Sequence, residues 1–87
     1  MDSFKVEVKR SFEHDLKKID LRFIPKILDN IERLSEEPFP PQSKKMKGSQ
    51  SSYRLRVGDY RIIYQVDINL KLVMVFYVRH RKDAYRH

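Results

Sequence analysis

One short segment constrains the fold most, because it predicts a β-hairpin with a defined register. Residues 53–57 and 60–66 are rich in β-forming residues and are separated only by Gly58 and Asp59. A two-residue loop that begins with glycine is typical of tight hairpins, because its backbone twist matches that of the flanking strands. The turn therefore fixes which residues of the two strands lie opposite each other.

This register gives the hairpin a basic face and an apolar face. Side chains alternate along a strand, so Arg54, Arg56 and Arg61 share one face, while tyrosines and aliphatic residues form the other. Arg56 is expected directly opposite Arg61, and like charges in such a pair destabilise a sheet. A bound phosphate would relieve this repulsion, because guanidinium groups bind phosphate oxygens in a bidentate manner. The alternative is a solvated face whose arginines pair with carboxylates from elsewhere in the chain.

Two helices are predicted before the hairpin. Apolar residues recur at helical spacing over residues 12–19, with Ser11 as the expected N-cap. A second helix is expected to begin near Phe23 or Ile24, because Pro25 is tolerated only in the first turn. The apolar stripe of this second helix, which we expect in the core, consists of Ile24, Ile27, Leu28, Ile31 and Leu34.

The remaining segments complete an α+β pattern. Residues 4–8 alternate as a half-buried strand, and three prolines introduce a loop over residues 38–51. Residues 70–79 are apolar at both alternating positions, which is typical of a central or well-covered strand. The order β-α-α-β-β-β predicts a small antiparallel sheet packed against an N-terminal helical hairpin, in a single domain over residues 1–87.

The charge is distributed unevenly. The net charge is +7, yet the first 43 residues carry eight basic and nine acidic side chains, and the remainder carries eleven and three. A one-sided basic field suits a polyanion, most often nucleic acid, although a basic protein without such a ligand is the alternative. The candidate RNA-binding residues are Lys44, Lys45, Lys47 and Arg79. The sequence leaves open which face of the sheet Arg79 joins.

Several classes of protein are disfavoured by what the chain lacks. It has no cysteine, which excludes disulfides and thiolate metal sites and fits a reducing cytosol. Its start has no apolar signal segment, and the longest apolar run, residues 72–78, is far short of the roughly 20 residues that a membrane span needs. Glycine-rich phosphate loops and metal-ligand spacings are also missing. We expect a cytoplasmic protein that uses no membrane, metal or cofactor.

The C-terminal segment supplies groups that can transfer protons. His80 stands between Arg79 and Arg81, whose positive charges disfavour a charged imidazole, and a neutral imidazole near a phosphate can act as a general base. Tyr85 and Arg81 are candidates for proton transfer and charge stabilisation, and a solvated basic tail is the alternative. Without a metal, RNA can supply its own nucleophile, the 2′-hydroxyl next to the scissile phosphate, while cations stabilise the developing charge.

Two motifs carry a resemblance to a known family. They are Y-R-L-R-V-G-D-Y-R-I-I-Y at residues 53–64 and H-R-K-D-A-Y at residues 80–85. With the β-α-α order before them, they resemble the RelE-like branch of the RelE/ParE toxin superfamily over nearly the whole chain. The resemblance implies a prokaryotic toxin neutralised by a cognate antitoxin protein, through which alone it would meet DNA. RelE-like members cleave mRNA in the ribosomal A site without metal, through a 2′,3′-cyclic phosphate.

The resemblance also implies residue roles. It assigns catalytic positions to Arg54, Arg56, Arg61, Arg81 and Tyr85, and His80 joins them from its own chemistry. Arginine stands where some members have lysine, and arginine stays protonated, so the general base is expected to be Tyr85 or His80. Two alternatives are a ParE-like gyrase inhibitor without nuclease activity and an inactive relative that only binds its antitoxin. The proton-transfer groups favour the nuclease.

Overall fold

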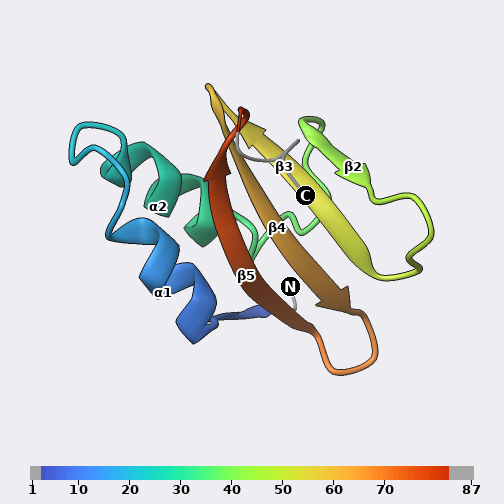
Figure 1. The fold of residues 1–87 in the computed structure, drawn as a ribbon. Helices are drawn as coiled ribbons and strands as arrows, with labels where there is room; N and C mark the ends of the chain where they lie inside the picture. The colour runs from blue at the N-terminus through green and yellow to red at the C-terminus, as the bar shows by residue number, and fades with distance from the viewer. Residues whose placement is uncertain (1–2, 83–87) are drawn as a thin grey trace.

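The computed structural model describes residues 3–82, in which two helices pack on one face of a five-stranded sheet (Figure 1). The elements in chain order are β1 (Lys5–Val8), α1 (Arg10–Leu16), α2 (Ile24–Arg33), β2 (Ser43–Lys45), β3 (Ser52–Val57), β4 (Tyr60–Asp67) and β5 (Leu72–His80). The strands lie in the order β1-β5-β4-β3-β2. The predicted α+β architecture is therefore confirmed.

The sheet differs from the prediction in two respects. It is mixed rather than wholly antiparallel, because β1 pairs in parallel with β5. No turn connects these two strands, so the local sequence does not fix their relative direction. In addition, part of the expected loop forms β2, which pairs with the outer edge of β3. Its polar residues show no alternation, and backbone hydrogen bonding to an otherwise open edge is what makes it a strand.

The hairpin has the predicted register. Val57 lies opposite Tyr60 and Arg56 opposite Arg61, and the pairing continues in step to Ser52 and Gln65. Gly58 has a φ of 59°, a left-handed conformation that glycine adopts without the steric penalty of a Cβ atom. The tight turn thus sets the two faces of β3 and β4.

The helices are confirmed with three corrections, the first of which is that α1 ends at Leu16, so Ile19 lies in the connection to α2. Helix α2 begins at Ile24 with the proline in its first turn, as predicted, but Leu28 is 43% exposed whereas Ile27 is fully buried. Ser11 is not the N-cap of α1, since that position is Lys9. The Ser11 hydroxyl instead donates a 2.7 Å hydrogen bond to the Phe76 carbonyl oxygen.

Where β1 ends, side chains of helix α1 bind the backbone at the edge of β5. Strand β1 pairs only as far as Val75, so the backbone beyond it needs other partners. Ser11 binds the Phe76 carbonyl, and an Asp15 carboxylate oxygen accepts the backbone N–H of Val78 at 3.3 Å. These side chains fix the C-terminal half of β5 against the helix.

Strand β5 contains a bulge that the sequence interpretation missed. The pairing with β4 shifts between Ile63 and Tyr64. As a result Val75 and Val78, three positions apart, are both buried, and the two residues between them are available to the opposite face. The apolar character of both faces of this run is thus explained partly by the bulge.

A buried tyrosine joins the sheet to the loop after α2. The Tyr64 side chain is fully buried, and its hydroxyl donates a 2.8 Å hydrogen bond to the Pro38 carbonyl oxygen. Its ring stacks against Tyr53 with centroids 5.8 Å apart. Burial raises the pKa of the Tyr64 hydroxyl above its ordinary value, because the phenolate is poorly solvated there.

We expect Tyr64→Phe to lower the free energy of unfolding at neutral pH by about 1 kcal/mol, because the Pro38 carbonyl loses its donor. A pKa raised on folding contributes stability that is present below the unfolded pKa and is lost as the pH rises through the folded pKa. The difference between the two proteins should therefore shrink above the ordinary tyrosine pKa of about 10. Urea unfolding followed by circular dichroism at about pH 8 and about pH 11 measures this. A pH-independent difference would contradict it.

Candidate functional site

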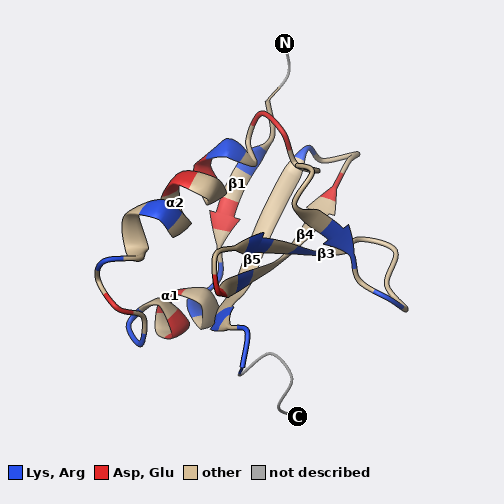
Figure 2. Cartoon of the chain, turned by 90° about the horizontal axis from the view of Figure 1, so that it is seen from above, with Lys and Arg blue, Asp and Glu red and all other residues tan. Residues whose placement is uncertain are grey.

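A row of three arginines crosses the sheet on the face away from the helices. Arg56 of β3 pairs with Arg61 of β4, and Arg61 pairs with Arg79 of β5. Residues directly opposite each other in a sheet point to the same face. Basic residues of neighbouring strands therefore lie side by side across the sheet (Figure 2). This arginine row settles the face that the sequence left open for Arg79.

A cavity of about 300 Å³ lies at one end of the arginine row. It is lined by Arg56, Gly58, Arg61 and Arg81. Arg81 is brought there by its backbone N–H, which donates a 2.7 Å hydrogen bond to the carbonyl oxygen of Asp59 in the hairpin turn. Among residues 3–82, the lining carries three guanidinium groups and no carboxylate. We call it the arginine pocket, and its size and charge suit a phosphate group.

The arginines differ in their carboxylate partners. Within residues 3–82, no carboxylate lies within ion-pair distance of Arg54 or Arg56. Arg79, in contrast, has its Nε atom 3.6 Å from Asp15 and its guanidinium carbon 4.3 Å from the centre of the Tyr77 ring. Part of the charge of Arg79 is thus compensated inside the protein, whereas that of Arg54 and Arg56 remains available to an anion.

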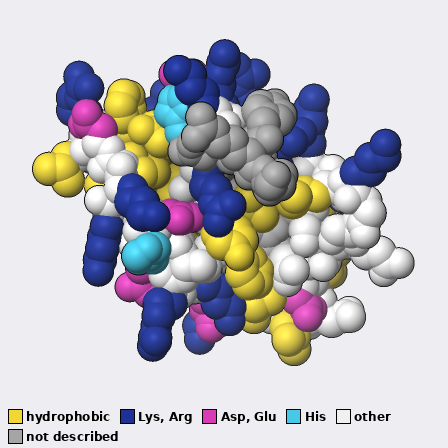
Figure 3. Space-filling view, viewed as in Figure 1, with side chains coloured by type: hydrophobic (Ala, Val, Ile, Leu, Met, Phe, Trp, Pro, Cys, Tyr) yellow, Lys and Arg dark blue, Asp and Glu magenta, His cyan; other side chains and the backbone are white. Residues whose placement is uncertain are grey.

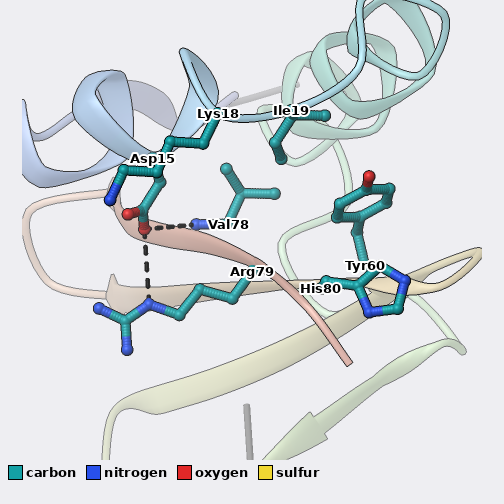
Figure 4. A pocket seen from close by; sticks show the side chains of 7 residues that line it. All are labelled: Asp15, Lys18, Ile19, Tyr60, Val78, Arg79 and His80. Atoms are coloured by element: carbon teal, nitrogen blue, oxygen red, sulfur yellow. Dashed lines mark hydrogen bonds and ion pairs between the residues drawn. The ribbon is translucent and has the colours of Figure 1, made fainter. Parts of the chain in front are cut away.

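His80 lies on the opposite face of the sheet from the arginine row. It pairs with Tyr60 on the helix-covered face, and the two rings meet edge to face with centroids 5.4 Å apart. Both line a cavity of about 490 Å³ beneath α1, where Figure 4 shows Asp15 facing Arg79. The Nδ1 atom of His80 accepts the backbone N–H of Lys82 at 3.2 Å. The structure does not bring His80 to the arginine pocket, and Tyr85 lies outside the described residues.

The predicted RNA-binding lysines are divided between the faces. Lys44 lies opposite Arg54 in the β2–β3 pair and shares its face, whereas Lys45 lies opposite Tyr53 and belongs to the other face. Lys47 borders a groove that the sequence did not predict. All three side chains are exposed.

This second hollow, the aromatic groove, lies on the same face as the arginine row and has a volume of about 300 Å³. Its lining is Met46, Lys47, Gly48, Ser49, Ser52, Ile63, Gln65, Phe76 and Tyr77. Figure 3 shows a band of hydrophobic side chains in the middle of this side of the molecule, with Lys and Arg around its upper end. The adjacent Phe76 and Tyr77 in the sequence were the signal that could have revealed a bulge.

Comparison with known proteins identifies the family. A family model described as the ParE toxin of the type II toxin–antitoxin system parDE matches residues 6–85. The chain belongs to this family of toxins. The RelE/ParE superfamily predicted from the two sequence motifs is thereby confirmed. No helix in the part of the chain that the structure describes is long and apolar enough to cross a membrane.

Individual relatives agree with this assignment. The RelE1 toxin of Methanocaldococcus jannaschii is 30% identical over 86 residues, which cover 95% of this chain and 96% of that protein. A chain of the archaeal RelE–RelB complex of Pyrococcus horikoshii OT3 superposes with a TM-score of 0.81 at 25% identity, covering 100% of both chains. A chain of the RelBE2 toxin–antitoxin complex of Mycobacterium tuberculosis gives 0.80 at 25% identity, covering 91% of this chain and 99% of that one. The toxin is thus RelE-like in fold.

Proposed function

We propose that this toxin is a ribosome-dependent endoribonuclease that cleaves mRNA in the ribosomal A site. The observation that carries the proposal is the arginine pocket, which Arg56, Arg61 and Arg81 line together. Like charges on directly paired strands are unfavourable unless an anion lies between them. A phosphodiester is the anion that guanidinium groups match best.

The proposed reaction uses the RNA as its own nucleophile. The 2′-hydroxyl loses its proton to a general base, attacks the adjacent phosphorus and displaces the 5′-oxygen of the next nucleotide, which takes up a proton. The product carries a 2′,3′-cyclic phosphate. The three guanidinium groups stabilise the charge that develops on the phosphate oxygens, and Arg54 on the same face holds a neighbouring phosphate.

The position of His80 bears on the identity of the base. Because this side chain lies across the sheet from the arginine pocket, it is poorly placed to take the 2′-hydroxyl proton. We therefore assign the base to Tyr85, which follows Arg81 by four residues.

An antitoxin is the proposed protein partner, alongside mRNA and the ribosome in the cytoplasm. Solved complexes of relatives in this family contain RelE together with RelB. An inhibitor that covers the arginine row would need acidic or amphipathic character, because this face is basic. Contact with DNA would come only through such an antitoxin.

Cleavage is tested by expressing the chain alone and mapping the 5′ ends of a transcript by primer extension. We expect growth arrest and new ends at codons of a translated mRNA, but none in the same transcript after its start codon is removed. Broken DNA with intact mRNA would instead indicate a gyrase inhibitor. Normal growth without cut transcripts would indicate a relative that only binds its antitoxin.

A further inference from the structure

The β-bulge in β5 places two aromatic side chains next to each other beside the arginine row. Phe76 and Tyr77 are consecutive, yet both line the aromatic groove, and their ring centroids are 6.4 Å apart. In a regular strand, one of them would point to the helices. Bulges that re-aim a side chain are common next to active sites.

Tyr77 lines the aromatic groove at the end that is next to the arginine row. It pairs with Ile63, one step along the sheet from the pair of Arg61 and Arg79. That step of two residues corresponds to about 7 Å, a distance that one nucleotide can bridge. Arg79 covers Tyr77 from the side of the arginine row, and the groove opens on the other side, toward Gln65.

The polar groups of the groove are suited to a hydrogen-bonding ligand. The Gln65 amide nitrogen donates to the Ser52 hydroxyl at 3.3 Å, and within residues 3–82 its carboxamide oxygen accepts no hydrogen bond. A carboxamide can pair with a base edge through its donor and its acceptor. Among the residues that the structure describes, the groove lining has no carboxylate and has Lys47 at its border, so it is compatible with a polyanion.

We propose that the aromatic groove binds an unstacked nucleobase next to the scissile phosphate, with Tyr77 as the stacking surface and Gln65 as the residue that distinguishes bases. This inference rests on the proposed nuclease function and adds a specificity site to it. Single-stranded RNA is commonly recognised by stacking splayed bases on aromatic rings and by hydrogen bonds to their edges. The positive charge of the groove border favours RNA only weakly over an acidic peptide segment, and the aromatic ring beside a carboxamide favours RNA more strongly. An antitoxin segment is therefore the competing occupant to be tested.

The test measures cleavage rates on purified ribosomes programmed with mRNAs that differ only in the A-site codon. We compare the unmodified toxin with Tyr77→Leu, Tyr77→Phe and Gln65→Leu. Stacking of one base on an aromatic side chain corresponds to a change in binding of about tenfold or more. We expect Tyr77→Leu to raise KM by about that factor, Tyr77→Phe to remain near the unmodified toxin, and Gln65→Leu to reduce the ratio of rates between preferred and poor codons.

Phe23→Leu is the matched control, because Phe23 is a partly exposed aromatic at the start of α2, on the helix side of the sheet. It should leave both KM and the codon ratio unchanged. Unaltered codon ratios and KM in Tyr77→Leu and Gln65→Leu would overturn the groove proposal while leaving the nuclease intact. The same result with weakened inhibition by antitoxin would assign the groove to the antitoxin. No cleavage by the unmodified toxin on any codon would instead refute the nuclease function itself.

Discussion

Arg61→Ala is expected to lower the rate of mRNA cleavage by about 100- to 1,000-fold, the loss that typically follows removal of one preorganised donor to a transition-state oxyanion. Arg61 is the central member of the arginine row and also lines the arginine pocket. In the arginine row it therefore lies between Arg56 and Arg79. Single-turnover cleavage on programmed ribosomes measures the effect, and loss of growth arrest provides the cellular readout.

Arg33→Ala is the control for this variant. Arg33 is an exposed arginine in the last turn of α2, where it pairs with Asp29 four residues earlier, and it does not line the arginine pocket. The Arg33→Ala variant loses the same charge as Arg61→Ala, so a general dependence on net charge would affect both variants equally. Thermal unfolding of both proteins shows whether the fold is retained. A folded Arg61→Ala protein that still cut mRNA at the unmodified rate would refute the role of the arginine pocket.

The residues that the hairpin brings together were predictable because a tight turn acts locally. Once Gly58 and Asp59 form the turn, the opposition of Arg56 and Arg61 follows from counting residues. Arg81 required more than counting. Its place in the pocket depends on β5 running back to the hairpin turn, where its backbone binds Asp59. The sequence made Arg81 a candidate for charge stabilisation, from its chemistry and from the family resemblance, without placing it next to Arg56 and Arg61.

The face of the sheet on which His80 lies could not be predicted from the sequence. Neighbours in sequence point to opposite faces of a strand, so neither Arg79 nor Arg81 is expected to share a face with His80. Whether the histidine or the arginines face the same side as Arg61 depends on the turn before β5 and on the bulge within it. Neither feature has a local sequence signature as clear as a glycine turn, because a bulge is stabilised by burial of Val75 and Val78 on the far side.

Helix α2 contains two adjacent apolar residues that are expected to contribute very differently to stability. The sequence assigned Ile27 and Leu28 to one apolar stripe, but a stripe at helical spacing is wider than the contact that one sheet face provides. Ile27 lies in the core and is fully buried, whereas Leu28 is 43% exposed at the margin. Only tertiary packing decides which edge of the stripe is covered.

Ile27→Ala is therefore expected to lower the free energy of unfolding by about 2–5 kcal/mol, through lost burial and the cavity left behind. For a domain of this size, each 1 kcal/mol corresponds to about 4–8 °C in Tm, so Tm should fall by roughly ten degrees or more. Leu28→Ala removes the same number of carbon atoms from the next residue and should cost less than about 1 kcal/mol. Chemical denaturation of both variants measures the contrast. Equal losses would mean that Leu28 is packed as tightly as Ile27, and that α2 sits on the sheet in a different rotation.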